Sequence, residues 1–217
     1  MTEAETPVKS DRAVRARGFL NRARRLERLL YASIGRAIIG RPAMARGAEG
    51  FRFHKAVMPV LIAFIAANAV ELFALDLALR RLLAVRIIAD GLDAWGLVWM
   101  IGLLCAFLMR PHTVGKDGIH IRDGLDLDVH VGWNNVRSVT LSRSVAATKT
   151  PRVTETDGIR ELAQRSQGET NLCIDLIVPA LIDLPGPEPA GGRHGIGRIR
   201  LWADDPDAFL AAAHQYV

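Results

Sequence analysis

The sequence contains few cysteines. Only Cys105 and Cys173 occur among its 217 residues. Cys105 lies in an apolar run and Cys173 in an expected strand, so we expect neither a disulfide bond nor a metal site to involve them. A fold held together by disulfide bonds is therefore excluded.

Enzyme motifs are also missing. The chain has no glycine loop ending in Lys-Ser or Lys-Thr, no His-Glu-x-x-His, no Gly-x-Ser-x-Gly and no dinucleotide-binding fingerprint after a strand. Gly191–Gly195 (GGRHG) is glycine-rich, but it lies in a Pro/Gly loop between expected strands and not before a helix. A flexible turn is a simpler interpretation of it than a phosphate-binding loop. We expect a non-enzymatic protein without catalytic residues, cofactor or metal.

Two long apolar runs are present in the middle of the chain, Ala56–Leu79 and Gly91–Met109. A helix rises about 1.5 Å per residue and a bilayer core is about 30 Å thick, so about 20 apolar residues can cross it. The alternative is a soluble protein with apolar core helices, but the segments on either side of the runs have ordinary polarity. The charged leader, residues 1–55, is far longer than the basic region of a signal peptide. We therefore predict a transmembrane hairpin.

Basic residues are concentrated before the first run. Residues 1–55 hold 13 Lys and Arg against 5 Asp and Glu, a net charge of +8, whereas residues 56–109 and 110–217 carry −1 and −2. Because short basic flanks stay in the cytoplasm, we expect a multi-pass protein of the plasma (cytoplasmic) membrane with both termini cytoplasmic. We expect no nucleic acid partner, since no reading helix or aromatic and basic surface is apparent.

Within this basic segment, apolar residues recur at intervals of three and four, which predicts an amphipathic helix. The apolar positions are Phe19, Leu20, Leu26, Leu29, Leu30, Ile34 and Ile38, and the basic ones include Arg12, Arg15, Arg22, Arg25, Arg28 and Arg36. Such a helix can lie on anionic lipid headgroups, each cation contributing about 1 kcal/mol. The alternative is a solvated helix that only enforces the topology. Gly40, Pro42 and Gly47 are expected to end it.

Three polar residues interrupt the first run and are candidate intramembrane sites: Glu71 near its middle, Asn68 one turn earlier, and Asp76 further on. A charge at the bilayer centre costs about 2.5–3.5 kcal/mol, so Glu71 should be protonated, paired or placed at a helix interface. Packing in a homo-oligomer is one interpretation. A proton or ion site, or a polar residue facing a thinned bilayer, are the others. We expect Asp76 to pair with Arg80 on the same helical face.

After residue 109 the pattern alternates with a period of two, which is typical of half-buried strands. We expect strands at Gly118–Arg122 and over residues 125–131. A three-residue loop, 123–125, is preferred because it places apolar residues opposite each other on one face. It gives the pairs Ile121–Leu127, Ile119–Val129, Arg122–Asp126 and His120–Asp128. On this register His120 and His130 are surface residues and not metal ligands.

Further strands are expected at Val136–Leu141, Leu172–Val178 and Ile196–Trp202. The polar stretch 142–170 can hide one more strand, and residues 185–195 form a Pro/Gly-rich loop. An aspartate cap and an early proline in residues 204–207 predict a terminal helix over Ala208–Tyr216. Strands followed by one helix favour a small barrel or bent sheet.

Five stretches, taken in order, resemble uncharacterised bacterial membrane proteins in which two transmembrane helices precede a cytoplasmic domain. They are Phe51–Pro59 (FRFHKAVMP), Val85–Leu104, Arg110–Gly124 (RPHTVGKDGIHIRDG), Glu169–Leu176 (ETNLCIDL) and Leu201–Phe209 (LWADDPDAF). Trp133-Asn134-Asn135-Val136 is similar to bacterial pleckstrin-homology-like (PH-like) domains. The resemblance covers about residues 51–210 and implies a bent seven-stranded sheet capped by a C-terminal helix, whereas the pattern alone yields five or six strands.

We therefore predict three segments: a basic amphipathic segment, 1–50; a two-helix transmembrane hairpin, 51–110; and a β-rich, PH-like cytoplasmic domain, 111–217. The fold class is a membrane α-helical hairpin plus a β-rich soluble domain. The expected function is the presentation of a cytosolic module that binds a protein or a lipid. The alternative is a small oligomeric membrane protein that uses Glu71 for ion or proton transport or sensing.

Overall fold

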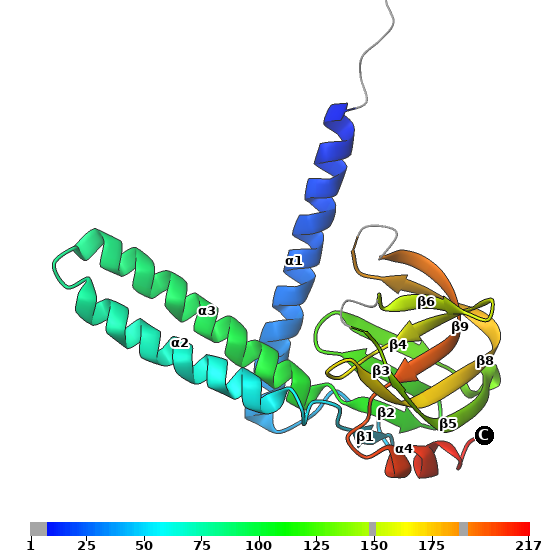
Figure 1. Cartoon of the computed structure of the whole chain (residues 1–217). Helices are drawn as coiled ribbons and strands as arrows, with labels where there is room; N and C mark the ends of the chain where they lie inside the picture. Colours follow the sequence, from blue (N-terminus) through cyan, green and yellow to red (C-terminus); the bar gives the residue numbers. More distant parts are fainter. Residues whose placement is uncertain (1–7, 148–150, 187–190) are drawn as a thin grey trace, which may run out of the picture.

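The computed structural model describes residues 8–147, 151–186 and 191–217, with side chains from residue 18 onward. Arg12 and Arg15 of the predicted basic face therefore lie outside the described side chains. In these ranges the chain forms a long N-terminal helix, a hairpin of two apolar helices, two β-sheets and a short C-terminal helix (Figure 1). The sheets lie at the open end of the hairpin, opposite its connecting turn.

The hairpin consists of α2 (Met58–Ala78) and α3 (Leu83–Met109) and confirms the two predicted apolar helices. At 1.5 Å per residue they are about 32 Å and 40 Å long, enough to cross a membrane. Their most apolar windows are only 0% and 11% buried by the rest of the chain. A core helix of a soluble protein would be buried by the rest of the chain, so this low burial argues against the alternative of a soluble protein with apolar core helices. The second apolar run was predicted from Gly91, whereas α3 already begins at Leu83.

The N-terminal helix α1 (Val8–Ile39) confirms the predicted basic helix. It ends in a Schellman motif at Gly40, whose φ is +70°. The Gly40 N–H donates to the Ala37 oxygen at 3.2 Å, and the Arg41 N–H donates to the Arg36 oxygen at 3.0 Å. Glycine adopts this left-handed conformation without a Cβ clash, so the helix ends where the sequence predicted.

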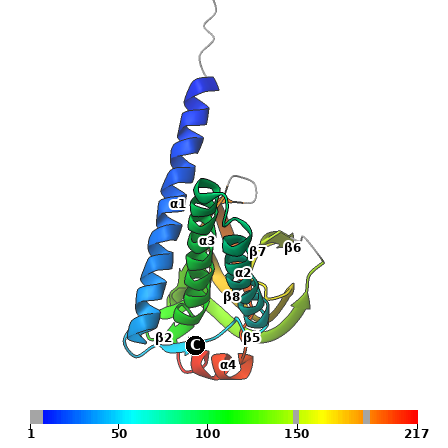
Figure 2. The ribbon, with the colours of Figure 1, turned by 90° about the vertical axis from the view of Figure 1, so that its left-hand side faces the viewer.

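Helix α1 crosses α3 near the base of the hairpin. Leu30 of α1 is 0% exposed and packs over Gly102 of α3, and Ser33 of α1 and Ala106 of α3 are also fully buried. The Ser33 hydroxyl donates to the Leu29 oxygen of its own helix at 2.7 Å, so this buried group is satisfied. Figure 2 shows α1 and α2 on opposite sides of α3, and Figure 1 shows that α1 then diverges from the hairpin.

The first sheet has the order β1-β2-β3-β4, and all neighbours are antiparallel. Its strands are β1 (Glu49–Phe51), β2 (His112–Gly115), β3 (Gly118–Asp123) and β4 (Leu127–Val131). Strand β1 precedes the hairpin and β2 follows it, yet the two are paired. The hairpin is therefore inserted between two neighbouring strands of one sheet.

The register of β3 and β4 differs from the predicted one. The structure pairs Ile119–Val131, His120–His130, Ile121–Val129, Arg122–Asp128 and Asp123–Leu127. The loop still has three residues, but they are 124–126, with Gly124 at φ +53°. A shift of two residues leaves every side chain on its predicted face, so alternation alone could not distinguish the two registers.

The second sheet has the order β5-β8-β9-β7-β6. Its strands are β5 (Val136–Val145), β6 (Val153–Thr156), β7 (Ile159–Ala163), β8 (Glu169–Leu184) and β9 (Gly192–Leu201). The stretch 142–170 thus hides two strands, and β7 pairs in parallel with β9. The prediction of a loop over the whole of 185–195 was wrong at its end, because residues 192–195 form the start of β9. Residues 187–190 lie outside the described ranges.

A single apolar core lies between the two sheets. Its largest fully buried side chains include Ile119, Ile121, Leu172, Ile174, Ile196 and Ile199. Helix α4 (Pro206–Ala213) closes one end, with Asp205 accepting the Ala208 N–H at 3.0 Å as the predicted aspartate cap. Phe209 of α4 packs edge-on against Phe51 of β1 at 5.1 Å between ring centroids. The C-terminal helix therefore also contacts the strand that leads into the hairpin.

Candidate binding site at the base of the hairpin

The predicted membrane-surface arginines all lie on α1. Arg22, Arg25 and Arg28 are exposed and Arg36 is half-buried near the helix end. Arg22 makes a 3.4 Å ion pair with Asp126 of the β3–β4 loop, which places α1 beside the first sheet. Large apolar side chains of the same helix are exposed as well: Phe19, Leu20, Tyr31, Ile38 and Ile39. Helix α1 therefore offers both cations and apolar groups to its surroundings.

The three polar residues of the first span do not form one site. Glu71 is exposed on the side of α2, while the Asn68 Oδ1 atom is buried without a hydrogen-bond partner among the described residues. The prediction that Asp76 pairs with Arg80 was wrong. Its carboxylate lies 2.7 Å from Nε of Arg86 on α3. The short turn brings the start of α3 within reach of Asp76, whereas the second apolar run was predicted only from Gly91.

Arg110, the residue that follows α3, was not among the predicted site residues. Its side chain is only 5% exposed. One Nη atom donates to the Gly124 oxygen at 3.2 Å and the other to Asp128 Oδ2 at 2.9 Å. Burial lowers the pKa of this arginine, and Asp128 opposes that change, whereas Arg122 and Arg36 add to it. A cation is therefore held inside the junction between the hairpin and the first sheet.

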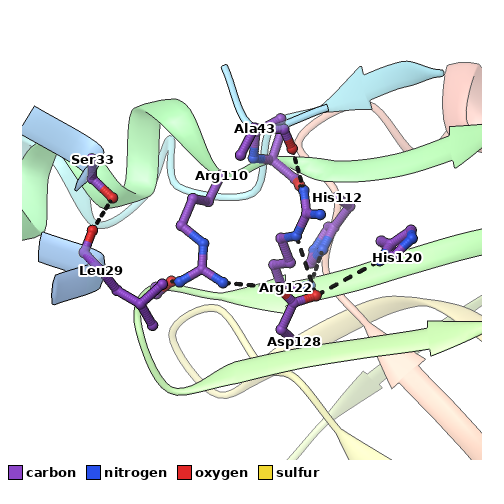
Figure 3. A network of polar contacts seen from close by, with 10 residues as sticks. Leu29, Ser33, Ala43, Arg110, His112, His120, Arg122 and Asp128 are labelled. Atoms are coloured by element: carbon purple, nitrogen blue, oxygen red, sulfur yellow. Dashed lines mark hydrogen bonds and ion pairs between the residues drawn. The ribbon is translucent and has the colours of Figure 1, made fainter. Parts of the chain in front are cut away.

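Arg122 reaches the same carboxylate from β3. Its Nε atom lies 3.3 Å from Asp128 Oδ1, and its Nη1 atom donates to the Ala43 oxygen at 2.6 Å. Figure 3 shows Arg110 and Arg122 converging on Asp128, with His120 on its other side. Ala43 in turn donates its N–H to the oxygen of Met109, the last residue of α3, at 2.7 Å. The network therefore ties the linker after α1 to the base of the hairpin.

His112, on β2, is fully buried beneath this network. Its Nδ1 atom accepts the Arg122 backbone N–H at 3.0 Å, so the ring proton is on Nε2, which donates to the Trp202 oxygen at 3.1 Å. The ring also stacks on Phe53 with centroids 4.5 Å apart. Burial lowers the pKa of His112 to about 4, although the Trp202 oxygen acts in the opposite direction. The neutral ring is therefore a structural link and not an acid–base group at neutral pH.

An open groove of about 970 Å³ lies on the α2 side of the base. Arg52 and Lys55 supply cations, whereas Met58, Ile62 and Leu108 supply apolar surface. Its polar edge is held in place because Asp204 donates its N–H to the Arg52 oxygen at 2.8 Å and its carboxylate accepts the Lys55 N–H. Burial lowers the pKa of the adjacent His54, with Asp204 opposing that effect.

No family model, curated protein or solved structure matches the chain. We therefore infer its function from the residues at the hairpin base and from the uncovered surface of the helices.

The two histidines of the first sheet face each other. His120 lies directly opposite His130, with ring centroids 4.3 Å apart, and not opposite Asp128 as predicted. Burial lowers the pKa of His120, and His130 and Arg122 act in the same direction. In the described part of the chain, no group of three or more His, Cys, Asp or Glu side chains is arranged to hold a metal ion.

One sequence signal could have located the junction. Arg110-Pro111-His112 follows an apolar helix directly, and His112 precedes a run that alternates in polarity. The position of Arg110 at a membrane boundary suggests an exposed anchor, and the pattern alone does not show that Gly124 and Asp128 hold its side chain inside the fold. His112 is buried where β2 pairs with β1, opposite Phe51.

Proposed function

We propose that the chain is a non-enzymatic integral membrane protein that crosses the cytoplasmic membrane twice and holds its β-rich part at the cytoplasmic surface, as a module that binds a protein or a lipid. The fixed junction carries this proposal. Strand β1 enters the hairpin, β2 leaves it, and the two pair from Glu49–Val114 to Phe51–His112. A module joined in this way stays at the membrane surface, because no free linker separates it from the helices.

The distribution of charge supports the cytoplasmic orientation. The C-terminal helix and both sheets lie at the open end of the hairpin, where Arg41, Arg52 and Lys55 are exposed. Arg80 and Arg81 lie at the opposite end. With α1 included, the cations are concentrated at the open end, which the positive-inside rule assigns to the cytoplasm. Helix α1 diverges from the hairpin, so its exposed arginines and apolar side chains can lie along an anionic leaflet.

We also propose that the β-rich part is a PH-like module of the kind found in bacterial membrane proteins. Two sheets around one core and a helix at the C-terminal end support this assignment. The nine strands of the described residues exceed the seven that the resemblance implies. One of the additional strands is β1, which precedes the hairpin.

A second candidate function rests on Glu71. Its side chain is exposed on the mainly apolar helix α2, and within the described residues it has no ion-pair or hydrogen-bond partner. A carboxyl group facing lipid is costly, so we propose that a second copy of the hairpin covers it. In such an oligomer Glu71 could serve ion or proton transport or sensing.

Cysteine labelling in intact cells tests the main proposal. Single cysteines are placed at Leu82, in the hairpin turn, and at Ala211, an exposed residue of α4, in a Cys105→Ala, Cys173→Ala background. We expect a membrane-impermeant maleimide to label Leu82→Cys in intact cells and Ala211→Cys only after permeabilisation. Labelling of Ala211→Cys from outside would reverse the orientation, and release of the protein by alkaline carbonate would rule out an integral membrane protein.

A further inference from the structure

A second open pocket lies on the α1 side of the hairpin base. It has a volume of about 550 Å³ and lies between the end of α1, the linker that follows it, and β3. We call it the arginine notch. It is lined by Arg36, Ile39, Arg41, Pro42, Ala43, Met44 and Arg122.

Positive charge in and around the notch exceeds the negative charge that faces it. Arg36, Arg41 and Arg122 line it, and the buried Arg110 is close enough to Arg36 for the two charges to repel. Asp128 is the carboxylate bonded to Arg110 and Arg122. Within the described residues, Arg36 and Arg41 have no carboxylate partner. The notch therefore has unneutralised guanidinium groups, which attract an anion.

Hydrogen-bond donors remain available in the notch. Arg122 uses Nε for Asp128 and Nη1 for the Ala43 and Pro111 oxygens. Its Nη2 atom donates to no acceptor among the described residues. The bonded atoms fix the orientation of this guanidinium, as Figure 3 shows for Asp128 and Ala43, so it is preorganised for a further acceptor.

The position of the notch selects the kind of anion. Ala43, which lines it, is hydrogen-bonded to the last residue of α3, so the notch lies level with the end of the hairpin. If the hairpin crosses the bilayer, this level is that of the lipid phosphates. Ile39 and Met44 are 68% and 40% exposed beside the arginines. An inorganic anion gains nothing from such apolar surface, whereas the glycerol and upper acyl chains of a lipid do.

We propose that the arginine notch binds the phosphate group of an anionic phospholipid of the cytoplasmic leaflet. This inference rests on the proposed membrane topology. Arginine suits the task because its planar fork can donate two parallel hydrogen bonds to phosphate oxygens. Bound lipid would neutralise the excess charge at the base and fix the linker between α1 and β1.

The test uses the full-length protein in nanodiscs of phosphatidylcholine containing a minor fraction of phosphatidylglycerol. Native mass spectrometry counts the phosphatidylglycerol molecules retained after release. The variant is Arg36→Gln, Arg41→Gln, because neither side chain has a hydrogen bond or ion pair among the described contacts. The control, Arg143→Gln, Arg193→Gln, removes the same charge from exposed positions on the second sheet.

We expect the wild type and the control to retain one phosphatidylglycerol molecule. In the notch variant, the fraction of protein that retains it should be about tenfold lower, because two charge-assisted hydrogen bonds of modest net strength are lost. Equal retention by the notch variant would overturn the proposal. Displacement of the lipid by millimolar inorganic phosphate would also overturn the proposal, because it would show that a free anion is the ligand.

Carbonate extraction of each variant is measured in parallel. If carbonate releases the protein, both the membrane topology and this inference are overturned. If the protein stays embedded and the variants retain the lipid equally, this inference alone is overturned.

Discussion

His112 donates its Nε2 proton to the backbone oxygen of Trp202, across 3.1 Å, and so joins the segment leaving the hairpin to the residue that follows β9. The other ring nitrogen accepts the Arg122 N–H, and the ring face rests on Phe53. Phe53 lies 5.9 Å from Phe107 of α3 between ring centroids. One neutral imidazole therefore connects both sheets to the helices, and protonation would remove the acceptor that Arg122 uses.

Stability of the β-rich part should fall as the pH falls from about 6.5 toward about 4. The pKa of His112 is about 4 in the folded protein against 6.5 for an unperturbed histidine, so the unfolded chain binds a proton that the folded chain does not. The loss should reach roughly 3 kcal/mol at the lower end of this range and vanish above its upper end. The lowered pKa values of His54 and His120 act in the same direction. Thermal unfolding of the detergent-solubilised protein, followed by tryptophan fluorescence across this pH range, measures the slope.

His112→Gln identifies the group responsible for that slope. The variant should be less stable than the wild type at pH 7.5, because glutamine does not reproduce both ring hydrogen bonds, but its stability should depend less on pH. His214→Gln, at the exposed end of α4, is the control and should leave the slope unchanged. A slope that persists in His112→Gln would assign the effect to other groups.

Gly102 permits the close crossing of α1 and α3. A Cβ atom at this position would overlap the Leu30 side chain, which is fully buried there. Gly102→Leu should therefore detach or displace α1 at a cost of about 1–3 kcal/mol, the range for overpacking. Limited trypsin digestion at the arginines of α1 should become faster. Gly96→Leu is the matched control, because a Cβ at Gly96 meets no atom within 4 Å, and it should digest like the wild type.

Asp128 neutralises a buried cation. The Arg110 side chain is only 5% exposed, and Asp128→Asn removes its carboxylate partner. We expect a loss of about 2 kcal/mol in unfolding free energy, less than for a fully enclosed pair because the Asp128 side chain is 35% exposed. Asp183→Asn breaks a pair whose side chains are 68% and 72% exposed and should cost under about 1 kcal/mol. Equal losses of unfolding free energy in the two variants, measured by chemical denaturation, would show that the Arg110–Asp128 pair contributes no more than an exposed ion pair.

Local patterns predicted the helices and the faces of the strands. The apolar runs define α2 and α3, Gly40 ends α1, and alternation places Ile119, Ile121, Val129 and Val131 in the core. They did not predict the β3–β4 register. Shifts of two residues preserve the faces, and the turn at Gly124 decides between them.

Long-range pairing accounts for what the sequence did not reveal. Strand β1 has three residues and β2 has four, too few for a periodic pattern, and they are neighbours only because the hairpin returns the chain to its starting level. His112 lies in that pairing, opposite Phe51, whereas Gly124 and Asp128 hold the Arg110 side chain. The arginine notch likewise combines residues 36–44 with Arg122, which are far apart in the sequence.

Two substitutions of Glu71 distinguish a role in oligomer packing from a role in ion or proton transport. Its side chain is exposed on α2, so a second hairpin that covers it would hold it through hydrogen bonds. We expect Glu71→Gln, which keeps the shape and hydrogen-bonding capacity, to retain association between hairpins. Glu71→Leu should shift the equilibrium about tenfold toward monomer, since an interhelical hydrogen bond in a membrane contributes about 0.6–2 kcal/mol. Single-molecule photobleaching in liposomes at pH 5.5 and 7.5 measures the association, and proton flux is recorded from the same liposomes. If the wild type conducts protons and Glu71→Gln abolishes the flux while association persists, the carboxyl group is a proton site, and packing alone does not explain its position.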